Sequence, residues 1–146
     1  MALHRRIAVL GVAVLVALFA SPGAAQAQEK YKVRLATVPM DGGMRSTVAG
    51  KGAATAVLNG AKLTVTGTFE GLLSPATSAH VHRGPAMGVR GSSFAELVVE
   101  KSPKGTVSGS VDLTPEQLRG LRAGQLYIQI ASEKAPDGNL WGWFVR

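Results

Sequence analysis

Short segments in which apolar and polar residues alternate recur along the chain from residue 31 almost to its end. Alternation with a period of two is typical of β-strands that bury one face. Stretches rich in glycine and proline, which favour turns, separate these segments. The pattern predicts strands or strand pairs over residues 31–38, 54–69, 94–99, 107–113, 126–130 and 139–145.

One segment predicts a hairpin with a defined register. The dipeptide Asn59-Gly60 favours a two-residue turn in which both central residues have positive φ. The register that follows places apolar residues on one face of the hairpin and polar residues on the other. The predicted apolar pairs are Leu58 with Ala61, Ala56 with Leu63 and Ala54 with Val65.

A single short helix interrupts the strand pattern. Thr114 is a suitable N-cap, Pro115 suits the first turn, and Gln117 completes a capping box. Gly124 favours the end of the helix, because glycine readily adopts the left-handed conformation. The sequence therefore predicts one helix directly after the strand at 107–113.

Seven or eight short strands and one helix favour a two-layered, all-β fold. We expect an antiparallel β-sandwich of the immunoglobulin-like or superoxide-dismutase-like kind, with one short helix. An open β-barrel is the competing architecture, because both folds produce the same alternation along their strands.

The first 27 residues differ in pattern from the rest of the chain. A basic start precedes an apolar run over residues 7–20, and Ala25-Gln26-Ala27 supplies the small residues of a cleavage site. These features predict a signal peptide over residues 1–27 and one domain over residues 28–146. The apolar run is shorter than the roughly 20 residues that span a bilayer, so a retained membrane anchor is the less favoured alternative. We therefore expect an exported protein, periplasmic or extracellular, without a membrane span after cleavage.

The chain contains no cysteine and carries a net charge of +7. Without cysteine it has no disulfide, no thiolate metal site and no cysteine nucleophile. The basic residues are spread along the sequence without a run, so we interpret them as solubilising charges. Nucleic acid is therefore not an expected partner, and the expected partner is an unidentified protein or small ligand.

Three blocks of sequence carry a resemblance to a known family. The blocks are Gly52-Ala-Ala-Thr-Ala-Val-Leu-Asn-Gly60 with Leu63-Thr-Val-Thr-Gly-Thr-Phe-Glu-Gly-Leu72, then Ala79-His-Val-His-Arg-Gly-Pro-Ala86, and then Leu113-Thr-Pro-Glu-Gln-Leu118 with Leu121-Arg-Ala-Gly-Gln-Leu-Tyr-Ile-Gln-Ile130 and Pro136-Asp-Gly-Asn-Leu-Trp-Gly142. Together they resemble a CHRD domain, the module first recognised in the extracellular protein chordin. The resemblance covers nearly all of residues 28–146. It implies a compact, exported, mostly β domain of the kind found singly in bacterial proteins.

The chain departs from the family pattern at two places. The family commonly has a histidine where this chain has Ala131. It also has a glutamate and an arginine that are missing from residues 138–142 of this chain. The resemblance therefore implies that any polar site built from those groups is altered here.

His80 and His82 lie two residues apart, so on a strand both side chains point to the same face. Two imidazoles at this spacing are candidate ligands for copper or zinc, with Met87 as a further soft ligand. Structural zinc usually has four protein ligands and catalytic zinc three, so the pair alone is incomplete. The alternative is a structural role in which the histidines form hydrogen bonds with the glycine-rich loop that follows. No other cofactor is expected.

The sequence shows no catalytic constellation. It has no Gly-x-Ser-x-Gly motif, and no Asp or Glu stands at a recognisable spacing from the two histidines. Glu70, Glu96 and Glu100 are isolated, so paired-carboxylate chemistry is not indicated. We therefore expect a non-catalytic binding or structural module rather than an enzyme.

Trp141 and Trp143 alternate with Leu140 and Phe144, so both faces of the last predicted strand are apolar. One face is expected to enter the core. The other face, with Trp141 and Trp143, is a candidate partner-binding patch. The alternative is that the loop over residues 39–52 covers it.

Overall fold

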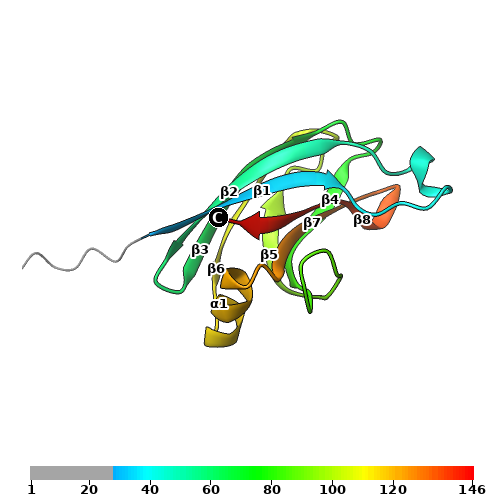
Figure 1. Cartoon of the computed structure of the whole chain (residues 1–146). Coiled ribbons are helices and arrows are strands. Elements are labelled where there is room, and N and C mark those ends of the chain that lie inside the picture. The colour runs from blue at the N-terminus through cyan, green and yellow to red at the C-terminus, as the bar shows by residue number, and fades with distance from the viewer. Residues whose placement is uncertain (1–27) are drawn as a thin grey trace, which may run out of the picture.

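A computed structural model describes residues 28–146, which form eight strands, one α-helix and one 3-10 turn (Figure 1). The predicted leader, residues 1–27, lies outside the described residues. Within residues 28–146, no helix has the length and apolar character needed to cross a membrane. The elements in chain order are β1 (Glu29–Thr37), η1 (Met44–Ser46), β2 (Lys51–Asn59), β3 (Lys62–Glu70), β4 (Ala76–Arg83), β5 (Ser92–Val99), β6 (Gly105–Asp112), α1 (Pro115–Arg122), β7 (Leu126–Ser132) and β8 (Ala135–Val145).

The strands form a closed antiparallel barrel in the order β1-β2-β3-β6-β5-β4-β7-β8. The prediction of an all-β, antiparallel fold with one short helix is confirmed, and the prediction of a β-sandwich is wrong. A sandwich has two separate sheets, whereas here β1 pairs with β2 on one side and with β8 on the other. Alternation along each strand is the same in both architectures, because each strand buries one face in either case.

Glycines stand where the strands approach one another most closely. Gly142 of β8 lies against Val33 and the backbone of Arg34 on β1, and Gly67 of β3 lies against Ala54 on β2. A side chain at either glycine would collide with the neighbouring strand. Glycine at such positions lets a sheet bend sharply, which is what closing a small barrel requires.

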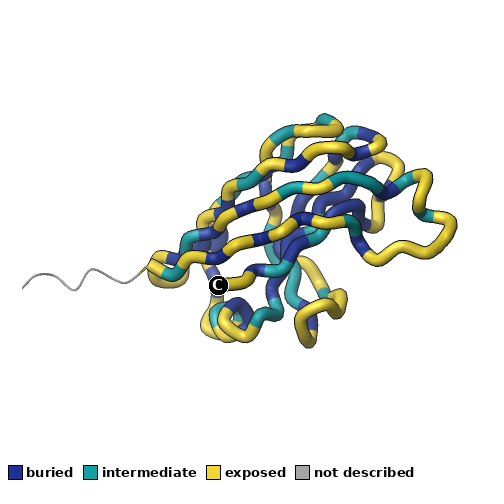
Figure 2. Tube along the Cα trace, turned by 45° about the horizontal axis from the view of Figure 1, so that its top comes forward, coloured by how far each residue is buried: buried dark blue, intermediate teal, exposed yellow. Residues whose placement is uncertain are grey.

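One hydrophobic core fills the barrel. Figure 2 shows buried and exposed residues alternating along the strands, as the sequence pattern predicted. Leu121 of α1 joins this core, and Leu118 packs at its margin. The fully buried aliphatic side chains at its centre include Leu63, Val65, Leu126, Ile128, Ile130 and Leu140.

The β2–β3 hairpin has the predicted faces but a different register. The turn residues are Gly60 and Ala61, and Asn59 is the last paired residue, opposite Lys62. Gly60 has φ of 64°, and among the described residues positive φ occurs only at glycine, which fits a turn with positive φ at its first central position alone. The apolar pairs are therefore Leu58 with Leu63 and Ala56 with Val65, while Ala54 faces Gly67.

The predicted register was wrong by two residues. A shift of two residues moves each residue to a new partner without turning it to the other face. Ala54, Ala56, Leu58, Leu63 and Val65 are accordingly buried together, as expected. Ala61, predicted to lie on this face, is an exposed turn residue instead.

Helix α1 matches the prediction closely. The Thr114 hydroxyl accepts a hydrogen bond from the Gln117 backbone N–H at 3.2 Å, and the Gln117 side chain accepts one from the Thr114 N–H at 2.9 Å. Pro115 is the first helical residue, and Gly124 adopts φ of 75° just beyond the end. The capping box and the terminal glycine therefore fix both ends of the helix.

A long loop with the turn η1 joins β1 to β2 and packs on the outside of the barrel. Val38 and Val48 of this loop pack with Ala135 of β8 and form a second, small hydrophobic core. Asn139, which is fully buried, accepts a hydrogen bond from the Ala49 N–H at 3.3 Å and donates one to the Ser132 hydroxyl at 2.9 Å. Asn139 thus ties this loop to strands β7 and β8.

Glu29 joins three parts of the chain at one end of the barrel. Its carboxylate accepts a hydrogen bond from the Tyr31 hydroxyl at 2.7 Å and forms ion pairs with Arg146 at 2.6 Å and Arg122 at 3.1 Å. The hydrogen bond from Tyr31 and then the two guanidinium groups lower the pKa of Glu29 from 4.5 to about 2. The start of β1, the end of β8 and α1 are held together by this one carboxylate.

We predict that Glu29→Gln lowers the free energy of unfolding at pH 7 by about 0.5–1 kcal/mol, as expected for a networked surface carboxylate. Because the folded-state pKa lies below the unfolded value, the contribution of Glu29 is complete above about pH 4.5 and is lost as the pH falls towards about 2. Urea unfolding between pH 2 and pH 7 should therefore show a shallower acid dependence in Glu29→Gln. Glu70→Gln, which loses only the exposed pair with Lys51, is the matched control. An unchanged acid dependence in Glu29→Gln would contradict this account.

Candidate functional site

Five aromatic rings lie together on the outer face of strands β4, β7 and β8, and we call them the aromatic surface. They are His80 and His82 on β4, Tyr127 on β7, and Trp141 and Trp143 on β8. The register places His82 beside Tyr127 and Tyr127 beside Trp143. The residues between them along each strand enter the core, so strand alternation brings all five rings to the outside.

The rings of the aromatic surface are in continuous contact. His82 stacks on Tyr127, with 4.8 Å between ring centroids and 18° between ring planes. Trp143 lies 4.4 Å from Tyr127 and 5.5 Å from Trp141, and the two indoles meet edge to face. His80 completes the row at 6.3 Å from His82. These separations are typical of favourable aromatic pairs.

Gly91 anchors the loop that follows β4 to two of these rings. The Tyr127 hydroxyl donates a hydrogen bond to the Gly91 carbonyl at 3.1 Å and accepts one from the Gly91 N–H at 2.9 Å. His82 Nδ1 lies 3.0 Å from the same carbonyl. A carbonyl only accepts hydrogen bonds, so Nδ1 of His82 carries the proton and donates it. A side chain at Gly91 would collide with the Arg83 carbonyl, which makes glycine necessary at this close approach.

The environment of His82 favours its neutral form. Burial is the largest cause that lowers the pKa of His82, and the positive charges of His80 and Arg90 lower it further. The hydrogen bond to Gly91 acts in the opposite direction but is weaker. His82 therefore forms the hydrogen bond to the glycine-rich loop that is expected if the histidines have a structural role.

The structure brings no complete set of metal ligands to the histidine pair. Among residues 28–146, no group of three or more His, Asp or Glu side chains is placed to hold a metal ion. Met87 is exposed and its methyl group lies beside Gly124, at the end of α1. Ala131, where the family pattern has a histidine, pairs with Ser78 on β4. Nothing in this arrangement favours copper or zinc.

The two tryptophans have different surroundings. Both are half-buried, and Leu140 and Phe144, which flank them in the sequence, enter the core. Trp141 packs against the β1–β2 loop, and the Arg90 guanidinium lies 5.9 Å from its ring centroid. The loop therefore shields part of Trp141, which is the alternative considered for this face. The ring neighbours of Trp143 are Tyr127 and Trp141.

Three members of this site were not singled out from the sequence. Tyr127, Gly91 and Arg90 are brought to the histidines only by the pairing of β4 with β7 and by the loop after β4. A signal for Tyr127 was available. It stands one position out of phase with Leu126 and Ile128, which places it on the outer face of its strand.

The fold and this site define an all-β barrel with an aromatic outer face. The family model of the CHRD domain matches residues 15–143. The chain therefore belongs to the CHRD domain family, as its sequence blocks indicated. No curated protein and no solved structure matches the chain significantly.

We predict that Tyr127→Phe lowers the free energy of unfolding by about 1–3 kcal/mol. Tyr127 is buried, and the change removes a hydroxyl that donates one hydrogen bond to Gly91 and accepts another from it. Chemical denaturation measures the loss, and amide hydrogen exchange should show faster exchange at Gly91. Equal protection of Gly91 in both proteins would show that this hydroxyl does not hold the loop.

We predict that the melting temperature falls as the pH is lowered from 7.5 to 5. The pKa of His82 is lower in the folded state than its usual 6.5, so the unfolded chain takes up the proton first. The contribution of neutral His82 to the free energy of unfolding is complete above pH 6.5 and is lost as the pH falls towards the pKa of His82 in the folded state. His82→Gln should flatten this dependence, whereas the matched variant His80→Gln should retain most of it, because burial of His82, the largest cause of its lowered pKa, is unchanged. The same slope in His82→Gln and the wild type would refute the assignment.

Proposed function

We propose that the protein is a non-catalytic binding module that acts in the periplasm or outside the cell, with residues 28–146 as its single domain. The observation that carries the proposal is the aromatic surface, in which Trp143 is half-exposed on β8. Large aromatic side chains dominate the binding energy of many protein interfaces. A half-exposed indole among other rings is therefore a suitable anchor for a partner.

The site is organised before any partner arrives. The rings stand on three paired strands, and the Gly91 hydrogen bonds fix His82 and Tyr127. Binding to a surface that is already ordered costs little side-chain entropy. This preorganisation supports a binding role for the aromatic surface beyond a role in packing.

The chemistry of the histidines supports binding over catalysis. A hydrolytic nucleophile needs a hydroxyl or thiol within hydrogen-bond reach of a base. Among the described residues, His82 bonds to the Gly91 carbonyl, and neither imidazole holds a Ser or Thr hydroxyl. The histidines thus serve as part of the ring surface.

The proposed location rests on the leader pattern and on the family. A basic start, an apolar run and a small-residue cleavage site are typical of exported proteins. Membership of the CHRD domain family is consistent with an extracellular type of domain. A cysteine-free barrel with its own core is suited to either compartment, since its stability does not depend on redox conditions.

We predict that Trp143→Ala weakens partner binding at least tenfold, or by about 1.4 kcal/mol, because an indole in such a surface is a typical hot spot. Immobilised wild-type protein is used to capture partners from the exported fraction. Each partner is then purified and its affinity measured by calorimetry. Val98→Ala removes an apolar side chain that is 73% exposed on β5 and serves as the matched control. Equal affinities for Trp143→Ala and the wild type would reject the aromatic surface as the binding site.

A further inference from the structure

Strand β1 gathers three basic side chains that look scattered in the sequence. Lys30, Lys32 and Arg34 alternate with core residues, so all three point outward from β1. Successive members lie two residues apart, or about 7 Å along the strand. No ion pair involves any of them within residues 28–146. We call these three residues the basic row.

The basic row lies directly beside the aromatic surface. Strand β1 pairs with β8 so that Val33 opposes Phe144 and Lys32 opposes Val145. The next position in this register sets Arg34 beside Trp143. The exposed part of the aromatic surface therefore continues into a line of unpaired positive charge.

A hollow of about 870 Å³ extends from the basic row across strands β1, β2, β3 and β6. Its floor follows one line of paired residues, because Arg34 opposes Ala53, Ala53 opposes Thr68, and Thr68 opposes Thr106. Three strand spacings of about 4.8 Å make this line about 14 Å long. The small side chains of Ala53 and the threonines leave room for an extended ligand above them.

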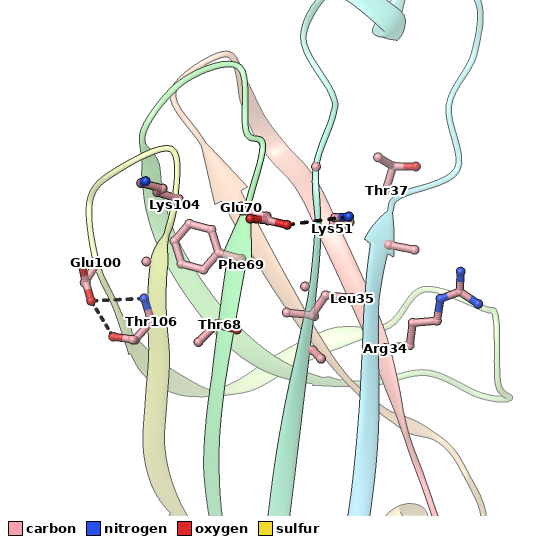
Figure 3. A pocket seen from close by; sticks show the side chains of 15 residues that line it. Arg34, Leu35, Thr37, Lys51, Thr68, Phe69, Glu70, Glu100, Lys104 and Thr106 are labelled. Carbon is pink, nitrogen blue, oxygen red and sulfur yellow. Dashed lines mark hydrogen bonds and ion pairs between the residues drawn. The ribbon is translucent and has the colours of Figure 1, made fainter.

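The charges of the hollow are arranged to attract an anion. Figure 3 shows Arg34 and Lys104 on opposite sides of the hollow, with Lys51 and Glu70 between them. Lys51 and Glu70 form an ion pair at 3.7 Å. Arg34 and Lys104 have no carboxylate within ion-pair distance in the described part of the chain. Two cations without a carboxylate partner thus lie on opposite sides of the hollow.

The acidic residue at the rim is already engaged. Glu100 accepts hydrogen bonds from the backbone N–H of Thr106 at 3.2 Å and from its hydroxyl at 2.7 Å. Its negative charge is therefore partly satisfied by the protein and competes less with a bound anion. In the hollow and the basic row together, positive side chains therefore outnumber negative ones.

We infer that the hollow and the basic row bind an extended acidic polysaccharide, with carboxylates held by Arg34 and Lys104 and sugar hydroxyls held by the threonine floor. The inference rests on the proposed function, because it names the ligand class of a surface that begins at Trp143. A chain entering over the indole crosses the basic row and then lies along the hollow. Salt bridges to carboxylates and an aromatic platform at one end are complementary to such a ligand.

The hydroxyl groups of the floor favour a polysaccharide over a nucleic acid. Thr and Ser hydroxyls both donate and accept hydrogen bonds, as sugar hydroxyls do, whereas phosphate oxygens only accept. The Thr106 hydroxyl donates to Glu100 at 2.7 Å and can still accept a hydrogen bond from a ligand. Next to the hollow, the hydroxyls of Thr55 and Thr66 are 3.4 Å apart, so they form at most a long bond with each other and retain most of their hydrogen-bonding capacity.

The test measures binding of the purified protein to polygalacturonate by calorimetry, with neutral dextran and oligothymidylate as comparison ligands. Arg34→Gln/Lys104→Gln removes the two free cations of the hollow. Arg119→Gln/Lys134→Gln removes the same charge from exposed positions on α1 and on the β7–β8 turn, and serves as the matched control. We expect the hollow variant to weaken polygalacturonate binding at least tenfold and the control variant to change it less than twofold, with no binding of dextran.

A third variant separates sugar recognition from general attraction of anions. Thr68→Val keeps the shape of the floor and removes one hydroxyl. It should weaken polygalacturonate binding without affecting any weak binding of oligothymidylate. Oligothymidylate binding as tight as polygalacturonate, with the same response to all variants, would overturn the polysaccharide assignment.

The inference and the proposed function fail in different ways. If the wild type binds no polygalacturonate, or if the hollow variant binds it as tightly as the wild type does, the inference is overturned. The proposed function stands in that case as long as Trp143→Ala still loses a captured partner. If Trp143→Ala changes the binding of neither a partner nor polygalacturonate, both are overturned.

Discussion

The backbone pairing of β1 with β8 is the contact on which the rest of the molecule depends. It joins the first and last strands and closes the barrel around one core. It also sets Trp143 of β8 beside Arg34 of β1, which are 109 positions apart in the sequence. Without this seam the aromatic surface and the basic row would stand on the edges of an open sheet, and the two surfaces would have no fixed relation.

The site depends on small residues as much as on large ones. Gly142 lets β8 lie close to β1, and Gly91 lets the loop after β4 approach Arg83 while it bonds to His82 and Tyr127. At each glycine the backbone lies so close to a neighbouring segment that a side chain would collide with it. The orientation of the rings is thus a consequence of backbone packing.

Much of the fold could be predicted from the sequence, because local patterns decide it. The faces of the strands follow from alternation, and the ends of α1 follow from Thr114, Gln117 and Gly124. Barrel closure could not be predicted, since alternation is the same for a sandwich and says nothing about which distant strands pair. The hairpin register was missed because the turn places Gly60, and not Asn59, at its first central position.

The candidate site was predicted in part. Trp141, Trp143 and the histidine pair were recognised, but their contact through Tyr127 depends on strand pairings that lie far apart in the chain. The basic row was overlooked because Lys30, Lys32 and Arg34 form no run. The same period of two that identified the strand places them on one face.

An NMR titration of the wild-type protein with polygalacturonate tests whether the aromatic surface, the basic row and the hollow act as one binding surface. We expect the indole N–H of Trp143 and the backbone amides of Arg34 and Thr68 to shift together and yield one dissociation constant, because they belong to one continuous surface. Shifts confined to the amides around α1 and the β7–β8 turn, or no shifts at all, would contradict this expectation.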